Sequence, residues 1–132
     1  MNLDILSWTE AYLRYKDSVQ RKILTLNREK DNLLICNLKD GGTHKYLCVD
    51  DLSSLKLADI NDFRVSCLNS KKNLSWLLDN WQELKELDVV FLFANPKKAA
   101  HWSISPKTHS NIVDKSAIKP GLKALFDSIP EV

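Results

Sequence analysis

The stretch FRVSCLNSKKNLSWLLDNWQELKELDVVFLFA, residues 63–94, decides the fold. Its two ends, residues 63–68 and 89–93, are short apolar runs that are typical of buried strands. Between them, Asn69 or Ser70 can cap a helix. The apolar side chains of that helix recur every three to four residues: Leu74, Leu77, Leu78, Trp81 and Leu84. Because a strand, a helix and a second strand in this order are long enough for a crossover, we expect one parallel pair of strands.

A hairpin pattern precedes this unit. Residues 32–38 and 43–49 flank a Gly-Gly pair, which favours a two-residue turn because both central positions of such a turn need positive φ. With that turn, Cys36 and Cys48 point to opposite faces of the hairpin. A three-residue bulged loop would shift the register and place the two cysteines opposite one another. On the first register we expect no disulfide.

The N-terminal segment predicts a helix followed by a strand. Ser7 and Glu10 have the spacing of a capping box, at the start of a helix that extends to about residue 21. One face of this helix carries five apolar side chains: Trp8, Ala11, Tyr12, Tyr15 and Val19. A strand over residues 22–27 comes next.

The C-terminal third predicts one more strand and two helices. Residues 100–104 alternate between apolar and polar side chains, as in a strand with one exposed face, and this alternation points Trp102 toward the core. The pair Ser105 and Pro106 favours the start of a short helix, and Pro120 favours the start of the last one. We therefore expect a single α+β domain over residues 1–132. Its mixed, mostly antiparallel sheet is packed by N-terminal, central and C-terminal helices.

The composition is that of an ordinary globular protein. Among 132 residues, 44% are hydrophobic and 27% are charged, and the net charge is +2. The longest apolar run, residues 89–94, is far shorter than a membrane span, and the N-terminus lacks the pattern of a secretory signal. The three cysteines have no metal-binding or redox spacing, so we expect buried free thiols. These features favour a soluble cytoplasmic protein that does not contact a membrane.

Common catalytic motifs are missing from the sequence. It contains no phosphate-binding glycine loop, no His-Glu-x-x-His and no serine between glycines. The only Glu-x-Lys, at residues 83–85, falls in a predicted helix, whereas the nuclease site that it would suggest needs a strand. We therefore predict no catalytic residue, no cofactor and no metal site. One alternative remains, a metal-dependent hydrolase or nuclease that uses His101, His109 and a carboxylate at Asp50 or Asp51.

Positive charge is concentrated in residues 96–123, which contain six lysines and one aspartate. Cations beside an aromatic side chain are typical of proteins that bind single-stranded nucleic acid. The second hypothesis is therefore a nucleic-acid-binding protein, and its expected phosphate contacts are Lys97, Lys98, Lys107, Lys119 and Lys123. The other interpretation is a solvated, lysine-rich surface.

Trp76 lies off the apolar stripe of the central helix, roughly opposite its centre. Tryptophan is enriched at the hot spots of protein interfaces, although Trp76 can also fold over the edge of the sheet. Because the catalytic motifs fail on spacing or context, the first hypothesis is a non-enzymatic binding module. It would contact another protein chain, or a second copy of itself in a homodimer, through Trp76.

Overall fold

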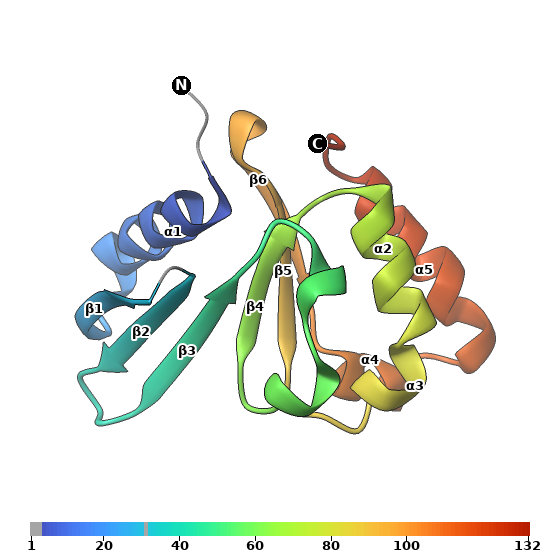
Figure 1. Ribbon diagram of the computed structural model, residues 1–132, viewed down its shortest axis with the longest axis horizontal. Helices are drawn as coiled ribbons and strands as arrows, with labels where there is room; N and C mark the ends of the chain where they lie inside the picture. Colours follow the sequence, from blue (N-terminus) through green and yellow to red (C-terminus); the bar gives the residue numbers. More distant parts are fainter. Residues whose placement is uncertain (1–3, 31) are drawn as a thin grey trace.

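The computed structural model describes residues 4–30 and 32–132, and Figure 1 shows a six-stranded sheet with helices on both faces. The first half of the chain forms α1 (Ile5–Gln20), β1 (Ile23–Glu29), β2 (Leu33–Leu38), β3 (Thr43–Cys48), η1 (Leu52–Ser54), η2 (Leu57–Asp59) and β4 (Arg64–Leu68). The second half forms α2 (Lys71–Asp79), α3 (Trp81–Leu84), β5 (Val90–Asn95), η3 (Pro96–Lys98), β6 (Ala100–Ile104), α4 (Pro106–Ile112) and α5 (Lys115–Asp127). The predicted α+β class is confirmed.

The strands lie in the sheet in the order of the chain, from β1 to β6. The pairs β1–β2, β2–β3 and β5–β6 are antiparallel, while β3–β4 and β4–β5 are parallel. The predicted crossover over residues 63–94 is therefore confirmed as β4, α2, α3 and β5. A second parallel pair, β3 and β4, is connected only by the short 3₁₀ turns η1 and η2.

The hairpin forms, but its predicted register is wrong. Cys36 lies opposite His44. The connection between the two strands therefore spans residues 38–42 and is longer than the predicted two-residue Gly-Gly turn. The Asp40 carboxylate accepts a hydrogen bond from the backbone N–H of Gly42, at 2.8 Å, which stabilises this longer loop. Cys36 and Cys48 consequently point to the same face, in contrast to the prediction, and both contribute to the core beneath α1. The three cysteines are free and buried, as expected.

Two helices begin earlier than predicted. Asp4, and not Ser7, caps α1, because its carboxylate accepts a hydrogen bond from the backbone N–H of Ser7 at 2.7 Å. The last helix starts at Lys115, so Pro120 lies inside α5 and does not open it. The central helix is also interrupted, since α2 ends at Asp79 and α3 starts afresh at Trp81.

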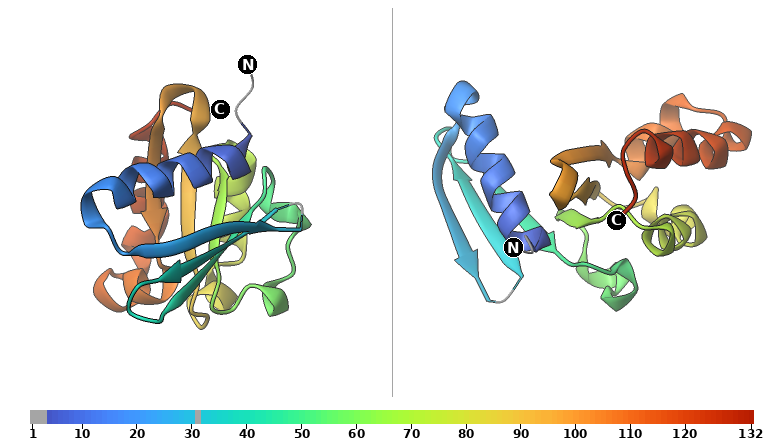
Figure 2. Two further views of the ribbon diagram at one scale, coloured as in Figure 1. Left: turned by 90° about the vertical axis from the view of Figure 1, so that its left-hand side faces the viewer. Right: turned by 90° about the horizontal axis from the view of Figure 1, so that it is seen from above.

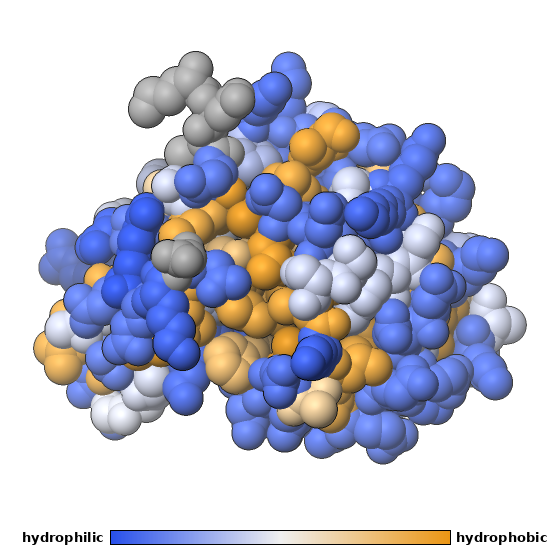
Figure 3. Space-filling model, in the orientation of Figure 1, coloured by the Kyte–Doolittle hydropathy of each residue, from blue (hydrophilic) through white to orange (hydrophobic). Residues whose placement is uncertain are grey.

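The larger core lies between the sheet and α2, α3 and α5. Its sheet residues are Val65, Cys67, Phe91, Phe93, Trp102 and Ile104. Trp102 points inward, as predicted, and stacks on Phe93 with ring centroids 4.4 Å apart. Leu47 of β3 and Leu57 of η2 are half-buried and pack against this core. Figure 3 shows hydrophobic residues at the surface near the middle of this side of the molecule.

The smaller core lies on the opposite face, beneath α1. Ile5, Trp8 and Leu13 of the helix pack against Leu34 of β2 and Leu92 of β5. Figure 2 shows α1 crossing the strands near the end of the sheet at which β4 and β5 finish. In the described part of the chain, no helix is both long and apolar enough to cross a membrane.

Candidate functional site

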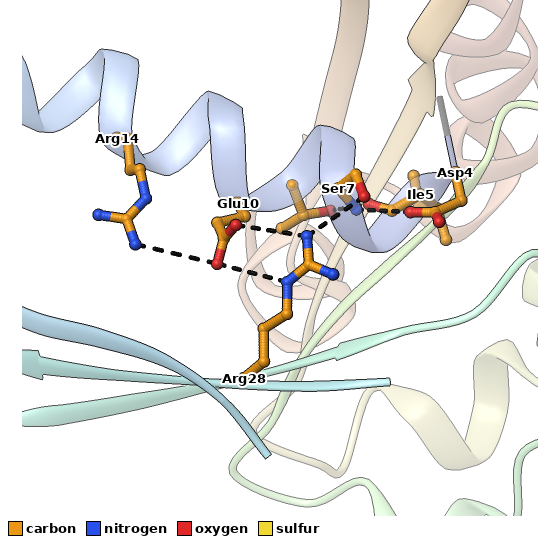
Figure 4. Close-up of polar contacts among 7 residues, drawn as sticks. Asp4, Ile5, Ser7, Glu10, Arg14 and Arg28 are labelled. Carbon is orange, nitrogen blue, oxygen red and sulfur yellow. Dashed lines mark hydrogen bonds and ion pairs between the residues drawn. The ribbon is translucent and has the colours of Figure 1, made fainter. Parts of the chain in front are cut away.

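A set of polar contacts anchors the N-terminal half of α1 on β1. The guanidinium of Arg28 donates hydrogen bonds to the Glu10 carboxylate at 3.3 and 3.4 Å and to the Ser7 hydroxyl at 3.2 Å (Figure 4). The same carboxylate lies 3.9 Å from Arg14, one turn further along the helix. These contacts fix where α1 crosses the sheet.

The C-terminal half of α1 is much less buried. Leu13 is buried, whereas Tyr15 is 79% exposed, Val19 is 83% exposed and Lys16 is also exposed. The apolar face predicted from the sequence therefore continues past the part of the helix that packs on the sheet. Only the earlier turns of α1 therefore pack against this face of the sheet.

Three cavities share one lining residue, Arg64 of β4: those of about 90 and 300 Å³ lie beside α1, and that of about 260 Å³ lies at the start of β4 and β5. We call this region the Arg64 cleft and define it by Leu13, Lys16, His44, Tyr46, Arg64, Val90 and Ser103. Its residues come from α1 and from four neighbouring strands, β3 to β6. The cleft is thus open space on the sheet, near the start of the parallel strands β4 and β5.

Arg64 is a half-buried residue whose guanidinium forms no ion pair with a carboxylate in the described part of the chain. Its guanidinium lies 3.4 Å from the ring nitrogen Nε2 of His44 and 5.9 Å from the centroid of the Tyr46 ring. Within residues 4–30 and 32–132, no carboxylate oxygen lies within 4.0 Å of this guanidinium. Burial of a charge is costly unless an opposite charge or hydrogen bonds compensate it. Arg64 is therefore poised to bind an anion.

The three cavities are lined by four cationic and three acidic side chains: Lys16, Lys22, Lys45 and Arg64 against Asp17, Asp62 and Asp88. Lys16 lines two of its three cavities, and the Asp17 carboxylate is engaged by the backbone N–H groups of Lys22 and Ile23, at 2.7 and 2.9 Å. Burial, together with the charge of Arg64, lowers the pKa of His44. The His44 ring is therefore neutral at pH 7 and can accept a hydrogen bond from Arg64.

Aromatic side chains line the same space. Tyr46 is half-buried, and burial raises the pKa of its phenol, so this ring stays uncharged. Tyr12 lines the smallest cavity, stacks on Trp8 at 5.2 Å and lies 4.6 Å from the exposed ring of His101 on β6. Burial and the charge of Lys16 lower the pKa of His101. Tyr12 and His101 therefore form an aromatic pair beside the smallest cavity, which Tyr12 lines and His101 does not.

The opposite end of the sheet is occupied by the chain itself. Ligands of open α/β sheets commonly bind beyond the carboxyl ends of the parallel strands. Here the Asn69 amide donates to the backbone oxygens of Phe126 and Pro130 and accepts from the Trp102 indole, and Asn95 also donates to Pro130. These buried amides are satisfied internally and serve the fold.

Beside these amides lies a cavity of about 530 Å³. Its charged lining residues have both signs, with Lys97 and Lys98 against Asp4, Asp50 and Glu131. Acidic side chains therefore outnumber basic ones in this lining by one, whereas basic side chains outnumber acidic ones by one around the Arg64 cleft.

The structure does not bring the five predicted lysines together. Lys97 and Lys98 are neighbours in η3, at the turn between β5 and β6. Lys107 on α4 lies 3.1 Å from Asp88, and Lys123 on α5 lies 3.5 Å from Asp127, so both have ion-pair partners. Lys119 lies on α5, beside a separate cavity.

The two histidines of the hydrolase hypothesis lie on opposite faces of the sheet. His101 packs near Tyr12 on the α1 side, whereas the His109 ring lies 5.9 Å from Trp81 on the other side. Asp50 and Asp51 are exposed just beyond β3. The described residues contain no group of three or more His, Cys, Asp or Glu side chains that could hold a metal ion.

Trp76 is half-buried and contacts the larger core. Its ring meets Phe91 edge-on, with centroids 6.0 Å apart. This is the arrangement in which Trp76 folds over the sheet, so the residue does not provide a fully exposed anchor for a partner.

Sequence reasoning missed the residues of the Arg64 cleft. A signal for them exists, because Arg64 is the one charged residue in an otherwise apolar strand pattern and His44 and Tyr46 alternate with Lys45 on β3. Comparisons with protein family models, curated proteins and solved structures yielded no match. Inference about function therefore starts from the cleft.

Proposed function

We propose that this protein is a non-catalytic binding module that recognises an anionic group, a phosphate or a carboxylate, in the Arg64 cleft. The observation that carries the proposal is that Arg64, a half-buried residue, has no carboxylate oxygen within 4.0 Å of its guanidinium in the described part of the chain. A guanidinium presents several N–H donors in a planar fork that matches both kinds of anion.

The size and charge of the cleft also support an anionic ligand. The two larger cavities, about 260 and 300 Å³, approach the range of pockets that hold small ligands. Lys16 adds a second cation to the lining. The neutral His44 ring accepts a hydrogen bond from the Arg64 guanidinium and so helps to orient it. A bound anion would compensate the desolvation of the guanidinium, which gives such a ligand its favourable free energy.

Titration of the protein with sodium phosphate and with sodium acetate, followed by amide NMR shifts, tests the proposal. We expect the largest shifts at Tyr46, Arg64 and the neighbouring strand residues. Arg64→Gln should weaken binding by about tenfold or more, because a hydrogen bond to a charged group is lost. Arg14→Gln is the matched control, since Arg14 is exposed and lies outside the cleft. Unchanged binding by Arg64→Gln, or shifts centred on Lys97 and Lys98, would contradict the proposal.

A further inference from the structure

We propose that β6, at one edge of the sheet, binds an extended segment of another protein as a seventh strand, and that α1 covers this added strand. The segment carries apolar side chains at alternate positions and acidic side chains at its ends. Its binding uses the backbone of β6 and is separate from the binding of an anion in the Arg64 cleft.

The two edge strands of the sheet, β1 and β6, differ in their protection against pairing. Natural proteins protect edge strands with charged side chains, proline or bulges. β1 has two of these features, because it carries Arg28 and Glu29 and its register shifts between Ile23 and Thr25. Within its described residues, 100–104, β6 has no charged side chain, no proline and no register shift against β5. Alternate N–H and C=O groups on its outer edge can therefore pair with another strand.

α1 extends beyond this edge of the sheet. Both views of Figure 2 show the last turns of the helix reaching past β6. The helix crosses the strand at Tyr12, whose ring lies 4.6 Å from that of His101. Tyr15 and Val19 follow on the same flank of the helix, because their spacing from Tyr12 is three and seven residues. Their side chains are 79% and 83% exposed, so the sheet leaves this part of the apolar stripe uncovered.

An added strand would complete the packing of α1. Neighbouring strands lie about 4.8 Å apart, so a seventh strand would lie beside β6 on the side where the helix projects. Every second side chain of that strand would point to the face of the sheet that carries α1. Apolar side chains at these positions would bury Tyr15 and Val19, which removes apolar surface from water and favours binding.

The charges around β6 favour acidic ends on the added strand. Lys97 and Lys98 precede β6 and Lys107 follows it, and residues 96–113 contain no acidic side chain. On α1, the amino group of Lys16 lies 5.9 Å from the centre of the Tyr12 ring, on the helix that would cover the strand. A segment as long as β6 would end beside the turns that carry the first three lysines. Acidic side chains there would have complementary charge, whereas basic ones would be repelled.

A second copy of this chain fits the edge less well than a single extended segment. If two copies paired through β6, the twofold axis would place both α1 helices on the same face of the joined sheet. Each helix already projects past its own β6, so the two helices would meet in the same space. An extended segment brings no such helix, and the space beside β6 can hold it.

Amide NMR titration with a blocked peptide of about seven residues tests the proposal. The peptide has valine at alternate positions, threonine between them and glutamate at both ends. One control peptide has lysine in place of glutamate, and the other has N-methyl groups on its backbone amides. We expect the largest shifts at residues 100–104, Tyr15 and Val19. Each control should bind at least about tenfold more weakly, because it loses the charge pairs or the backbone hydrogen bonds.

Variants of two exposed apolar residues test which edge is used. Val19→Asp should weaken peptide binding by at least about tenfold, because it removes an apolar contact and repels the glutamates. Leu24→Asp is the matched control, since Leu24 is 65% exposed and lies on β1, the protected edge. We expect this control to bind the peptide as the natural protein does. Urea unfolding of each variant checks that it is folded.

The other outcomes overturn the proposal in distinguishable ways. No binding of the glutamate peptide at about 1 mM would refute the seventh strand. Equal binding of the N-methylated peptide, or weaker binding by Leu24→Asp but not by Val19→Asp, would place the contact away from β6. Equal binding of the lysine peptide would refute an acidic partner. Shifts centred on Arg64 would show that the glutamates bind in the cleft, and concentration-dependent shifts at residues 100–104 without peptide would identify a second copy as the occupant.

Discussion

On one face of the sheet, α2, α3 and α5 cover apolar side chains, whereas on the other α1 covers only the half near the carboxyl ends of β4 and β5. The difference is visible between neighbouring residues of one strand. Phe91 of β5 is fully buried under the helices of the first face, while Val90 points into the Arg64 cleft. The comparison shows that the same strands are covered by three helices on one face and only in part by α1 on the other.

The uncovered half is also the polar half. Arg64, His44 and Ser103 lie beside cavities that Leu13 and Lys16 of α1 line but do not fill. A face that served packing alone would hold apolar residues at these positions. We therefore call the face under α2, α3 and α5 the structural face and the face with the Arg64 cleft the binding face, after its proposed function.

The largest expected effect is on the structural face. Phe91→Ala should lower the free energy of unfolding by about 3–5 kcal/mol, because it leaves a cavity in the larger core and removes the edge contact with Trp76. Val90→Ala, one residue earlier on the same strand, should cost about 1 kcal/mol or less, since Val90 is half-buried beside open space. Urea unfolding measures both. Similar losses for the two variants would mean that the faces are equally packed.

Substitutions of two arginines test the same comparison through smaller changes in the free energy of unfolding. Arg28→Met removes the contacts with Glu10 and Ser7 that anchor α1, and should cost about 0.5–1 kcal/mol because this ion pair is partly exposed. Arg64→Met should leave stability unchanged or raise it by up to about 1 kcal/mol, because it removes a half-buried charge that has no carboxylate partner in the described chain.

The same two variants should rank oppositely in ligand binding. Arg64→Met should lose affinity for phosphate, whereas Arg28→Met should keep most of it, since Arg28 lies outside the cleft. A chemical-denaturation curve and a phosphate titration of each protein provide the four values. If Arg64→Met were the more destabilised variant, Arg64 would be a structural residue and the division between the two faces would fail.

Particular elements show what the sequence can and cannot predict. The strand–helix–strand over residues 63–94 is predictable because each element carries its own periodicity. The hairpin register is not, because it depends on how the Asp40 side chain closes the loop. Likewise, the alternation of His44 and Tyr46 shows that they share a face, but not whether a helix covers that face.

The position of α1 decides that question. It is set by tertiary contacts such as the one between Arg28 and Glu10, which lie 18 residues apart in the chain. Periodicity alone therefore predicts Tyr15 and Val19 as part of a packed face, although the helix meets the sheet only through its earlier turns. The candidate site lies where the apolar pattern of α1 predicts packing on the sheet but the helix does not cover it.

The smallest expected effect is the response of the binding face to pH. The folded-state pKa of His44 lies below its ordinary value, because burial and the charge of Arg64 outweigh the opposing charge of Asp40. The unfolded chain therefore binds more protons as the pH falls below about 6.5. The stability contributed by neutral His44 is present above that pH and is lost as the pH falls through the folded-state pKa. The melting temperature should decline accordingly, and less so in His44→Gln.

Anion affinity should respond to pH with the opposite sign. Protonated His44 adds a positive charge beside Arg64, so acetate, which stays largely ionised between pH 5.5 and pH 7.5, should bind more tightly at the lower pH. Other charged residues line the cavities shared by His44: Lys16, Asp17, Lys22, Lys45, Asp62 and Asp88. Over the same pH range, His44→Gln should show a smaller gain in affinity than the natural protein. Titrations at the two pH values measure this difference, and equal gains in both proteins would place the titrating group elsewhere. A stability that falls while affinity rises would show that this face of the sheet keeps its polar residues for a ligand, at some cost to the fold.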